Sequence, residues 1–299
     1  MFKYFFSIFL KMRFNINNIF RKPNYYNKII KYNTVLNYFN IKNIQISKNC
    51  EIFLAKNHIT NEYVIIKKCN NILNINQFIL EANFLEILKN VNGISRLKHI
   101  CLEKPYFLIL KRIKGFELFY YILKNTLSYD IKKNILKQLC EIIQNIHFLQ
   151  IIHLDIKLEN IMITETDSFD RLTATIIDFG LSLKNGDIIS KYRGTQIYSA
   201  PELLKLIFKN NNKNIIISPK LDIWSLGIVI YYMFFSYEYG ELNNKILKKI
   251  EDNTFLKNKK LKNIELFNLI NLMHNVLKTD PEERLSLVNI LKHDLFLFK

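Results

Sequence analysis

The pattern of apolar and polar residues changes along the chain from short apolar runs to long helical periodicities. The runs between residues 38 and 111 are rich in β-branched side chains and are separated by polar turns, such as Asn57-His58 and Thr60-Asn61. This pattern predicts short strands, the first three of them consecutive and antiparallel. The predicted strands are residues 41–46, 51–55, 63–68, 97–100 and 107–110.

Apolar residues recur at helical spacing in several longer segments. One of them, residues 76–88, lies between the predicted strands and carries Glu81 and Glu86 among its apolar positions. The others, which follow residue 111, are residues 131–148, 221–234 and 264–277. A strand-rich part followed by a helix-rich part predicts an α+β fold of two lobes with a ligand-binding cleft between them.

The first residues differ in composition from the rest. No Asp or Glu precedes Glu51, and the apolar run within residues 1–13 is shorter than the roughly 20 residues that a membrane-spanning helix needs. We therefore predict no transmembrane segment and assign residues 1–37 to a basic N-terminal extension, residues 38–112 to a small lobe and residues 113–299 to a larger lobe. The extension is either a targeting or membrane-surface segment, or a biased stretch that packs on the domain or frays.

Composition limits the classes of function. Of 299 residues, 49% are hydrophobic and 23% are charged, which is ordinary for a globular chain and excludes disorder as a description of the whole. The four cysteines, Cys50, Cys69, Cys101 and Cys140, include no C-x-x-C pair, so neither a zinc site nor a disulfide framework is predicted. A reducing compartment and a cytoplasmic location are therefore expected.

The net charge of +17 is interpreted as compositional bias. Only seven of the 43 basic residues are Arg, and they are dispersed, whereas Arg is the residue that recognises phosphates bidentately. We therefore predict no specific nucleic-acid partner, although a weak, salt-sensitive affinity for polyanions would follow from the charge.

Two polar motifs follow predicted elements in the second half of the chain. His153-Leu154-Asp155-Ile156-Lys157-Leu158-Glu159-Asn160 comes after a periodic helix, and Asp178-Phe179-Gly180 closes an apolar strand. Together they resemble the catalytic loop and the magnesium loop of eukaryotic protein kinases. The further signatures that match this family, in its order, are Gly194-Thr195, Ala200-Pro201-Glu202, Asp222-Ile223-Trp224-Ser225-Leu226-Gly227 and Arg284.

The resemblance implies a bilobal protein-kinase fold and a serine/threonine protein kinase, which transfers the γ-phosphate of ATP to Ser/Thr hydroxyls of a protein substrate with the help of Mg²⁺. Lys157 and Thr195 imply Ser/Thr rather than Tyr specificity. The finer resemblance, carried by residues 108–110, 151–160 and 198–202, is to the calcium/calmodulin-dependent kinase group and the Pim family. We expect a monomer.

On this resemblance, Asp155, Lys157 and Thr195 are the catalytic residues. Asp155 would accept the proton of the substrate hydroxyl and orient it, and Lys157 would place a cation near the transferring phosphate. Asn160 and Asp178 would supply oxygen ligands for Mg²⁺, a hard ion that prefers oxygen.

The resemblance also implies which residues hold the nucleotide. Lys67 would bind the α- and β-phosphates, and Glu81 would pair with Lys67 and fix it, with Glu86 as the alternative partner. The remaining nucleotide-binding positions are Ile52 in the phosphate-covering loop, Ile65 above the adenine and Ile113 in the hinge.

The phosphate-covering loop departs from the family pattern. Its glycines should fall at Gln45, Ser47 and Cys50, and none of the three is glycine. Because glycine lets backbone N–H groups approach phosphates, the lid is expected to be looser or displaced. Two functions therefore remain: an active kinase, favoured by the retained charged residues, and a pseudokinase that acts as a scaffold or binding module with weakened nucleotide binding.

Two acidic residues bear on the substrate, because Glu117 and Glu159 match family positions that bind substrate Arg. We therefore expect substrates with basic residues N-terminal to the phosphorylated hydroxyl. Glu202 and Arg284 are expected to form a buried structural ion pair, and Asp222 is expected to cap the backbone of the catalytic loop.

The activation segment lacks both halves of a phosphate switch. Leu154 stands where many family members hold the Arg that pairs with the phosphate, and Lys191 stands at the usual phosphorylated position. Activity is therefore expected without phosphorylation of this segment, with Ser190 and Tyr192 as the remaining candidate sites.

Overall fold

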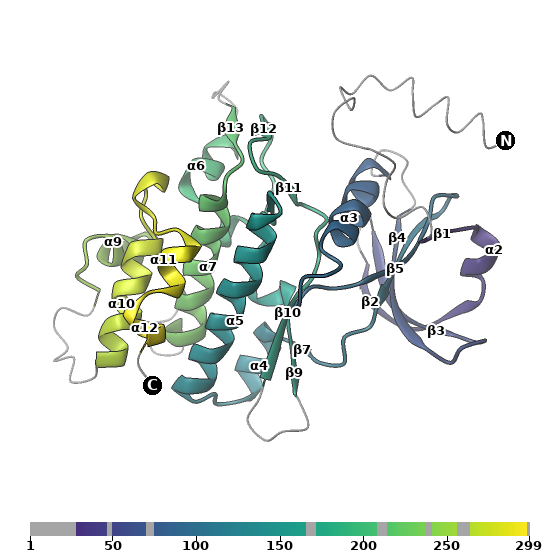
Figure 1. Ribbon diagram of the computed structural model, residues 1–299, viewed down its shortest axis with the longest axis horizontal. Helices are drawn as coiled ribbons and strands as arrows, with labels where there is room; N and C mark the ends of the chain where they lie inside the picture. Colours follow the sequence, from purple (N-terminus) through teal and green to yellow (C-terminus); the bar gives the residue numbers. More distant parts are fainter. Residues whose placement is uncertain are drawn as a thin grey trace.

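A six-stranded sheet forms the first lobe and a mainly helical part forms the second (Figure 1). The structure is a computed structural model that describes residues 28–46, 50–69, 75–165, 172–207, 214–236, 241–255 and 264–297. The predicted α+β fold of two lobes is confirmed. The sheet contains β1 (Ile29–Ile30), β2 (Tyr38–Ile46), β3 (Glu51–Asn57), β4 (Tyr63–Cys69), β5 (Leu97–Cys101) and β6 (Tyr106–Lys111), in the spatial order β1-β5-β6-β4-β3-β2.

The strands β2, β3 and β4 pair antiparallel in sequence order, as the short polar turns between them predict. Side chains alternate between the two faces of β4. Val64 and Ile66 are buried in an apolar cluster on the outer face of the sheet, whereas Ile65 packs against the main core. Lys67 shares the inner face with Ile65 and therefore points toward the second lobe.

Residues 28–37, which composition assigned to the extension, contribute β1 and the short helix α2 (Tyr32–Val35) to the first lobe. The strand β1 runs parallel to β5, with Ile29 opposite Ile100, and Val35 is buried in the outer apolar cluster. Residues 1–27, with the candidate targeting segment, lie outside the described residues, as do Ser47 and most of the polar run at residues 210–214.

The helix α3 (Ile75–Ile87) packs against β5 and β6. It buries apolar side chains, such as Phe84 and Leu85, but it also buries Glu81 and Glu86, each only 3% exposed. A buried carboxylate is stable only with a cation or hydrogen-bond donors beside it. The position of α3 therefore depends on finding partners for two charges.

The helices α5 (Tyr129–Phe148) and α7 (Pro219–Phe234) form the centre of the second lobe. Ser128 caps α5 by accepting a hydrogen bond from the Ile131 amide, and the apolar stripe of α5 is buried, as its period predicts. Most residues of α7 are buried on every face, because the other elements of the lobe surround it. Within the described part of this lobe, the other α-helices are α4 (Leu118–Lys124), α6 (Pro201–Leu204), α9 (Asn244–Glu251), α10 (Ile264–Val276), α11 (Leu287–Leu291) and α12 (Asp294–Leu297).

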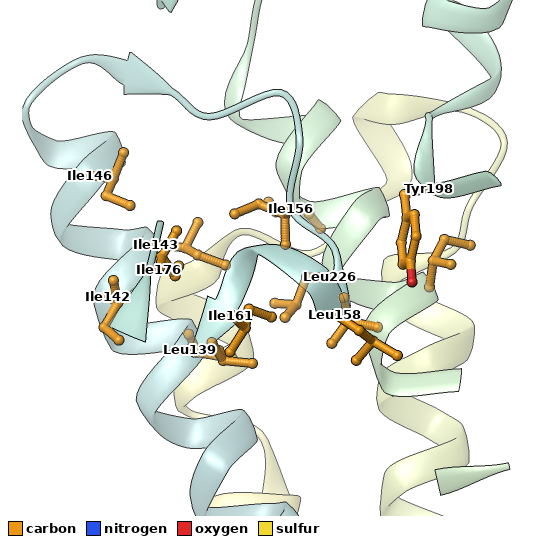
Figure 2. Packing of buried hydrophobic residues seen from close by; sticks show 14 of the residues in the cluster. Leu139, Ile142, Ile143, Ile146, Ile156, Leu158, Ile161, Ile176, Tyr198 and Leu226 are labelled. Carbon is orange, nitrogen blue, oxygen red and sulfur yellow. The ribbon is translucent and has the colours of Figure 1, made fainter. Parts of the chain in front are cut away.

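A hairpin of β9 (Ile161–Glu165) and β10 (Leu172–Ile176) brings the two polar motifs together. Ile161 and Ile176 lie opposite each other and are buried against α5 side chains such as Leu139 (Figure 2). The catalytic loop ends where β9 begins, and the magnesium loop begins just after β10 ends. The apolar packing of the hairpin against α5 therefore holds the polar residues of the two loops close to each other. The remaining short strands are β7 (Phe116–Glu117), β8 (Ile151–Ile152), β11 (Leu183–Lys184), β12 (Ile188–Ile189) and β13 (Ile215–Ile216).

The expected ion pair of Glu202 and Arg284 lies inside this lobe. The guanidinium of Arg284 is fully buried and donates from its two Nη atoms to the two carboxylate oxygens of Glu202, at 2.7 and 2.8 Å. It also donates to the carbonyl oxygens of Lys220 and Lys278 and stacks 5.0 Å from the ring centre of Trp224. The pair joins the loop before α11 to α6 and to the first turn of α7. Among the helices that the structure describes, none combines the length and the apolar character that crossing a membrane requires.

We predict that Arg284→Leu lowers the free energy of unfolding by about 3–5 kcal/mol, because the carboxylate of Glu202 loses its bidentate partner. Urea denaturation followed by circular dichroism measures the difference. Glu283→Gln, at the exposed neighbouring position, is the control and should change stability by less than about 0.5 kcal/mol. A loss below about 1 kcal/mol in Arg284→Leu would contradict a structural role for the pair.

Candidate active site

Asp222 of α7 holds the backbone of the catalytic loop. Its buried carboxylate accepts hydrogen bonds from the amides of His153 and Leu154 and from Nε2 of His147, each at 2.8 Å. Leu154 has a φ of 66°, a left-handed conformation that is costly for a branched side chain, so the loop needs this support. Burial would raise the pKa of Asp222, but the hydrogen bond and charge of His147 lead the interactions that lower it.

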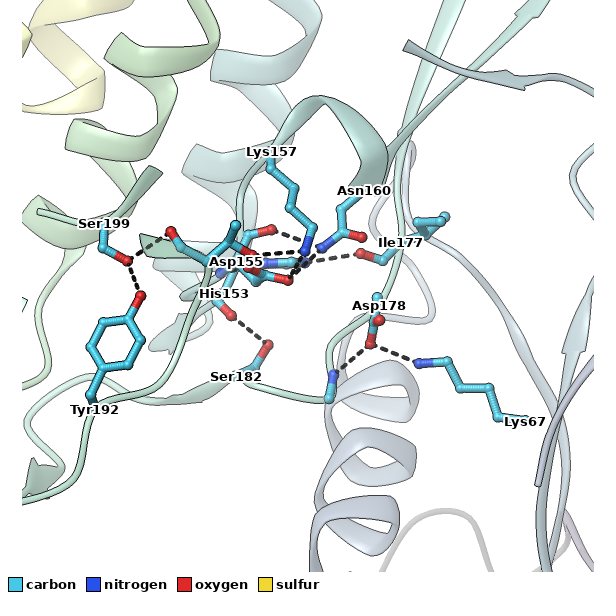
Figure 3. Close-up of polar contacts among 12 residues, drawn as sticks. Lys67, His153, Asp155, Lys157, Asn160, Ile177, Asp178, Ser182, Tyr192 and Ser199 are labelled. Atoms are coloured by element: carbon cyan, nitrogen blue, oxygen red, sulfur yellow. Dashed lines mark hydrogen bonds and ion pairs between the residues drawn. The ribbon is translucent and has the colours of Figure 1, made fainter. Parts of the chain in front are cut away.

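Asp155, Lys157 and Thr195 form a closed set of polar contacts (Figure 3 shows Asp155 and Lys157). The Nζ atom of Lys157 lies 2.8 Å from Oδ2 of Asp155 and donates to Oγ1 of Thr195 at 2.8 Å. The hydroxyl of Thr195 donates to Oδ1 of Asp155 at 2.7 Å. Both carboxylate oxygens of Asp155 are therefore held in place by neighbouring side chains, as a proton acceptor with a fixed orientation requires.

Asn160 completes the catalytic loop from its short helical turn. Its side-chain amide nitrogen donates to the backbone oxygen and to Oδ2 of Asp155, both at 2.9 Å. Because the nitrogen is occupied in this way, the side-chain oxygen of Asn160 is the atom that can bind a cation. The amide of Ile177 donates to the backbone oxygen of Asn160 at 2.9 Å and so ties this residue to the magnesium loop.

His153 joins the catalytic loop to the magnesium loop. Its buried ring accepts a hydrogen bond from the Asp155 amide at Nδ1, at 3.2 Å, so the ring proton lies on Nε2. That Nε2 atom donates to the carbonyl oxygen of Ile177 at 3.1 Å, and the ring packs edge-on against Phe179 with centroids 4.7 Å apart. His153 therefore has a positioning role rather than a reactive one.

Lys67 bridges the lobes. Its Nζ atom lies 2.7 Å from Oε1 of Glu81 on α3 and 2.7 Å from Oδ1 of Asp178 in the magnesium loop. The structure therefore brings Lys67 together with Glu81 and not with the alternative, Glu86, whose partners are Lys28 and Lys89.

The charges of this cluster follow from its contacts. Burial lowers the pKa of Lys67, but Asp178 and Glu81 outweigh it and raise the pKa overall, so the ammonium stays charged. Burial would raise the pKa of Asp178, but Lys67 and the Gly180 amide lower it to about 2. Asp178 is therefore an ionised carboxylate at neutral pH, as a metal ligand must be.

Two contacts in the site involve residues that the sequence analysis did not single out. The side chain of Gln77 donates to the carbonyl oxygen of Gly180 at 2.6 Å, so α3 also contacts the magnesium loop directly. His147 supports Asp222. No periodicity or motif distinguishes Gln77, since a polar residue near the start of a helix is ordinary. His147 lies one residue before the end of α5, where the apolar pattern gives no reason for it.

The residues expected to bind the nucleotide lie on the inner face of the sheet and in the segment that follows its strand β6. Ile52 is opposite Lys67 across β3 and β4, and Ile65 is opposite Leu110 of β6. Ile113 follows β6 in the segment that connects the lobes and is partly buried. At the replaced glycine positions, Gln45 is exposed at the end of β2, and burial raises the pKa of the Cys50 thiol to about 11.

The activation segment is held by bonds that need no phosphate. Tyr192 and Ser199 share a hydrogen bond of 2.7 Å between their hydroxyls, and Ser199 also donates to the backbone oxygen of Thr195 at 3.0 Å. Arg193 donates to the carbonyl oxygen of Leu181 at 3.2 Å. Lys191, at the usual phosphorylated position, is exposed.

Acidic side chains gather beside the catalytic loop. Burial first, and then the charge of Glu159, raises the pKa of Glu117. Within the described residues, the buried Oε2 atom of Glu159 has no hydrogen-bond partner. A cation bound here would offset the burial and the neighbouring charge that act on Glu117 and would give the Oε2 atom of Glu159 a partner.

The donor set fits magnesium bound together with phosphates. Within the described ranges, no group of three His, Cys, Asp or Glu side chains could hold a metal ion by itself. Asp178 and Asn160 instead offer one ionised carboxylate oxygen and one amide oxygen from adjacent loops. Magnesium is commonly held by one or two protein oxygens plus the phosphates of a nucleotide, so this pair is suited to it.

Comparison with known proteins agrees with this geometry. The family model of the protein kinase domain matches residues 41–296. The chain therefore belongs to the protein kinase domain family, as its motifs predicted.

The curated relatives include Ser/Thr kinases from several organisms. The chain is 28% identical over 172 residues to the probable serine/threonine-protein kinase fhkD of Dictyostelium discoideum, covering 55% of this chain and 23% of the relative. It is 30% identical over 168 residues to calcium-dependent protein kinase 2 of rice, covering 54% of this chain and 30% of the relative. It is 34% identical over 169 residues to the fission yeast serine/threonine-protein kinase cds1, covering 55% of this chain and 35% of the relative. The matches span about a quarter to a third of the length of these relatives.

These relatives confirm the predicted resemblance to Ser/Thr protein kinases, including its calcium/calmodulin-dependent side. The roles of the individual site residues stay predictions. In the structure, the charged and polar residues assigned by resemblance form two groups of direct contacts, one of Asp155, Lys157, Thr195 and Asn160, the other of Lys67, Glu81 and Asp178.

Proposed function

We propose that this domain is a serine/threonine protein kinase that uses ATP and Mg²⁺. The observation that carries the proposal is Lys67, which lies 2.7 Å from both Glu81 and Asp178. A lysine ammonium group, which is suited to binding phosphate, thereby lies beside the carboxylate that would bind the metal. The two groups come from different lobes, so the lobes are positioned for a common site. The proposal includes a protein substrate and keeps the monomer and the cytoplasmic location expected from the sequence.

In this function, each polar residue of the candidate active site has a defined task. When bound, MgATP supplies the transferable phosphoryl group and part of the charge neutralisation. Asp155 orients the substrate hydroxyl and takes its proton, while Thr195 keeps the carboxylate of Asp155 in place. Lys157 supplies positive charge where negative charge increases during transfer. Asn160 and Asp178 present oxygen atoms to the metal.

The missing glycines of the phosphate-covering loop affect nucleotide binding, whereas the catalytic residues act on phosphate transfer. Gln45 and Cys50 replace positions that cover phosphates, so their effect falls on nucleotide binding rather than on the charges that stabilise the transition state. The proposed enzyme therefore binds ATP weakly but transfers phosphate. A scaffold without phosphate transfer is the alternative outcome of the experiment below.

We expect radiolabelled phosphate to pass from ATP to a Ser/Thr peptide panel with the wild-type protein. Asp155→Asn should reduce kcat by about 10²–10⁴-fold, because the proton acceptor is lost, and Asp178→Ala should do the same by removing a metal ligand. Asp130→Asn, on the exposed first turn of α5, is the matched control. Equal transfer by wild type and Asp178→Ala, or the absence of detectable nucleotide binding, would refute the enzyme and favour the scaffold.

The acidic residues beside the catalytic loop predict the substrate. Peptides with Arg or Lys N-terminal to the phosphorylated hydroxyl should be preferred, because they would bring a cation into contact with Glu117 and Glu159. Glu159→Gln should lower kcat/KM for such a peptide by about 10- to 100-fold, and much less for a peptide with Ala at those positions. A peptide library that shows an acidic or proline-directed preference would contradict this prediction.

The activation segment predicts the regulation. Treatment with phosphatase should leave the rate of phosphate transfer unchanged, because hydroxyl and backbone bonds hold the segment in place of a phosphate. Ser190→Ala should be equally active. Tyr192→Phe should lose only the contribution of one hydrogen bond, about 0.5–1.5 kcal/mol in stability. A collapse of activity after phosphatase treatment, or in a folded Ser190→Ala or Tyr192→Phe variant, would show that a phosphate is needed.

A further inference from the structure

Residues 28–37 precede the part of the chain that matches the kinase family, yet they are built into the first lobe. The strand β1 extends the sheet beyond β5, with Ile30 opposite Cys101. The amide of Tyr32 donates to Oε2 of Glu103 at 2.7 Å, and its ring stacks on Phe107 with centroids 6.1 Å apart. Val35 is 6% exposed. The segment is therefore anchored by backbone pairing and by apolar burial.

Lys28, at the start of this segment, contacts α3. Its Nζ atom lies 2.6 Å from Oε2 of Glu86 and donates to the carbonyl oxygen of Leu97 on β5 at 2.9 Å. The other carboxylate oxygen of Glu86 pairs with Lys89 at 2.9 Å. Burial would raise the pKa of Glu86, but Lys28 and Lys89 outweigh it and lower the pKa, so this buried residue is ionised.

Glu86 and Glu81 hold α3 from different directions. They are five residues apart on the helix, which places their side chains roughly 140° apart around its axis. Glu81 points to Lys67, and Glu86 points to Lys28. Any rotation or outward shift of α3 that separates Glu81 from Lys67 would also pull Glu86 from Lys28, and it would leave a buried carboxylate short of a partner.

We propose that Lys28 and Glu86 are positioning residues, through which the segment before the kinase domain holds α3 where Glu81 fixes Lys67. The inference rests on the proposed kinase function, because its consequence is the correct placement of a phosphate-binding lysine. Lys89 alone does not replace Lys28, since its side chain is 51% exposed and it lies in the turn directly after α3. Of the two lysines that pair with Glu86, Lys28 is the one that comes from a separate part of the chain and so ties the helix to the segment before the kinase domain.

The test compares Lys28→Met with Lys31→Met, an exposed lysine three residues further along the same segment. Lys28→Met should raise hydrogen exchange in residues 75–87 and weaken the affinity for MgATP by about threefold to thirtyfold. Lys31→Met should match the wild type in both measurements. Lys28→Arg, which keeps the cation, should restore most of the loss.

A second background separates positioning from general stability. In Glu81→Gln, Lys67 has already lost its partner on α3, so adding Lys28→Met should cause no further loss of MgATP affinity. Should Lys28→Met fail to fold, the double variant Lys28→Met/Glu86→Gln removes both charges and leaves no buried orphan. It should fold and show the same increase in exchange and the same loss of affinity.

The proposal is overturned if Lys28→Met, or the double variant in its place, leaves exchange in residues 75–87 and MgATP affinity at wild-type values. It is equally overturned if the loss of affinity is as large in the Glu81→Gln background as in the wild type. Both measurements are independent of phosphate transfer. A wild-type protein that transfers no phosphate would therefore refute the kinase function without deciding the role of Lys28.

Discussion

The arrangement of this domain depends on the buried ammonium group of Lys67. The residue is 7% exposed, and an ammonium in such a place is stable only with carboxylates beside it. The two carboxylates come from different elements, Glu81 from α3 and Asp178 from the loop after β10. One charge therefore sets the relative positions of β4, α3 and the second lobe. It also explains why α3 is held by additional contacts, because the ion pairs are lost if the helix moves by even a few ångströms.

The same cluster explains how the domain can lose its lid glycines and keep its chemistry. Backbone N–H groups of a glycine-rich lid bind phosphates in the ground state and the transition state alike, so their loss weakens binding more than it slows transfer. Charge stabilisation and proton transfer depend on Asp155, Lys157 and Asp178. Their partners are Thr195 and backbone atoms of the second lobe and Lys67 of β4. None of these partners belongs to the lid, so replacements in the lid leave the contacts intact.

Periodicity and motif order predict most of the fold and nearly all of the candidate site. The strands and long helices follow from alternation and helical spacing, and the resemblance to the kinase family favours Glu81 over Glu86 as the partner of Lys67. The elements β1 and α2 are not predictable in this way, because two and four residues carry no period and lie in a stretch whose composition looks like a biased tail. Contacts such as that of Gln77 with Gly180 join residues far apart in sequence. They depend on the final distance between α3 and the magnesium loop, which no local pattern encodes.

The activation segment shows how order is reached when a phosphate-binding arginine is absent. The hydroxyl of Tyr192 bonds to Ser199, Ser199 bonds to the backbone of Thr195, and Thr195 bonds to Asp155, so order in the segment is transmitted to the catalytic carboxylate. Each neutral hydrogen bond contributes only about 1 kcal/mol, less than a phosphate paired with arginine, but it is present without modification. The enzyme as proposed, which needs no phosphate here, would carry no charge switch at the segment. Control of its activity then falls on the other element that must be in place, the helix α3, whose position depends on ion pairs at two faces.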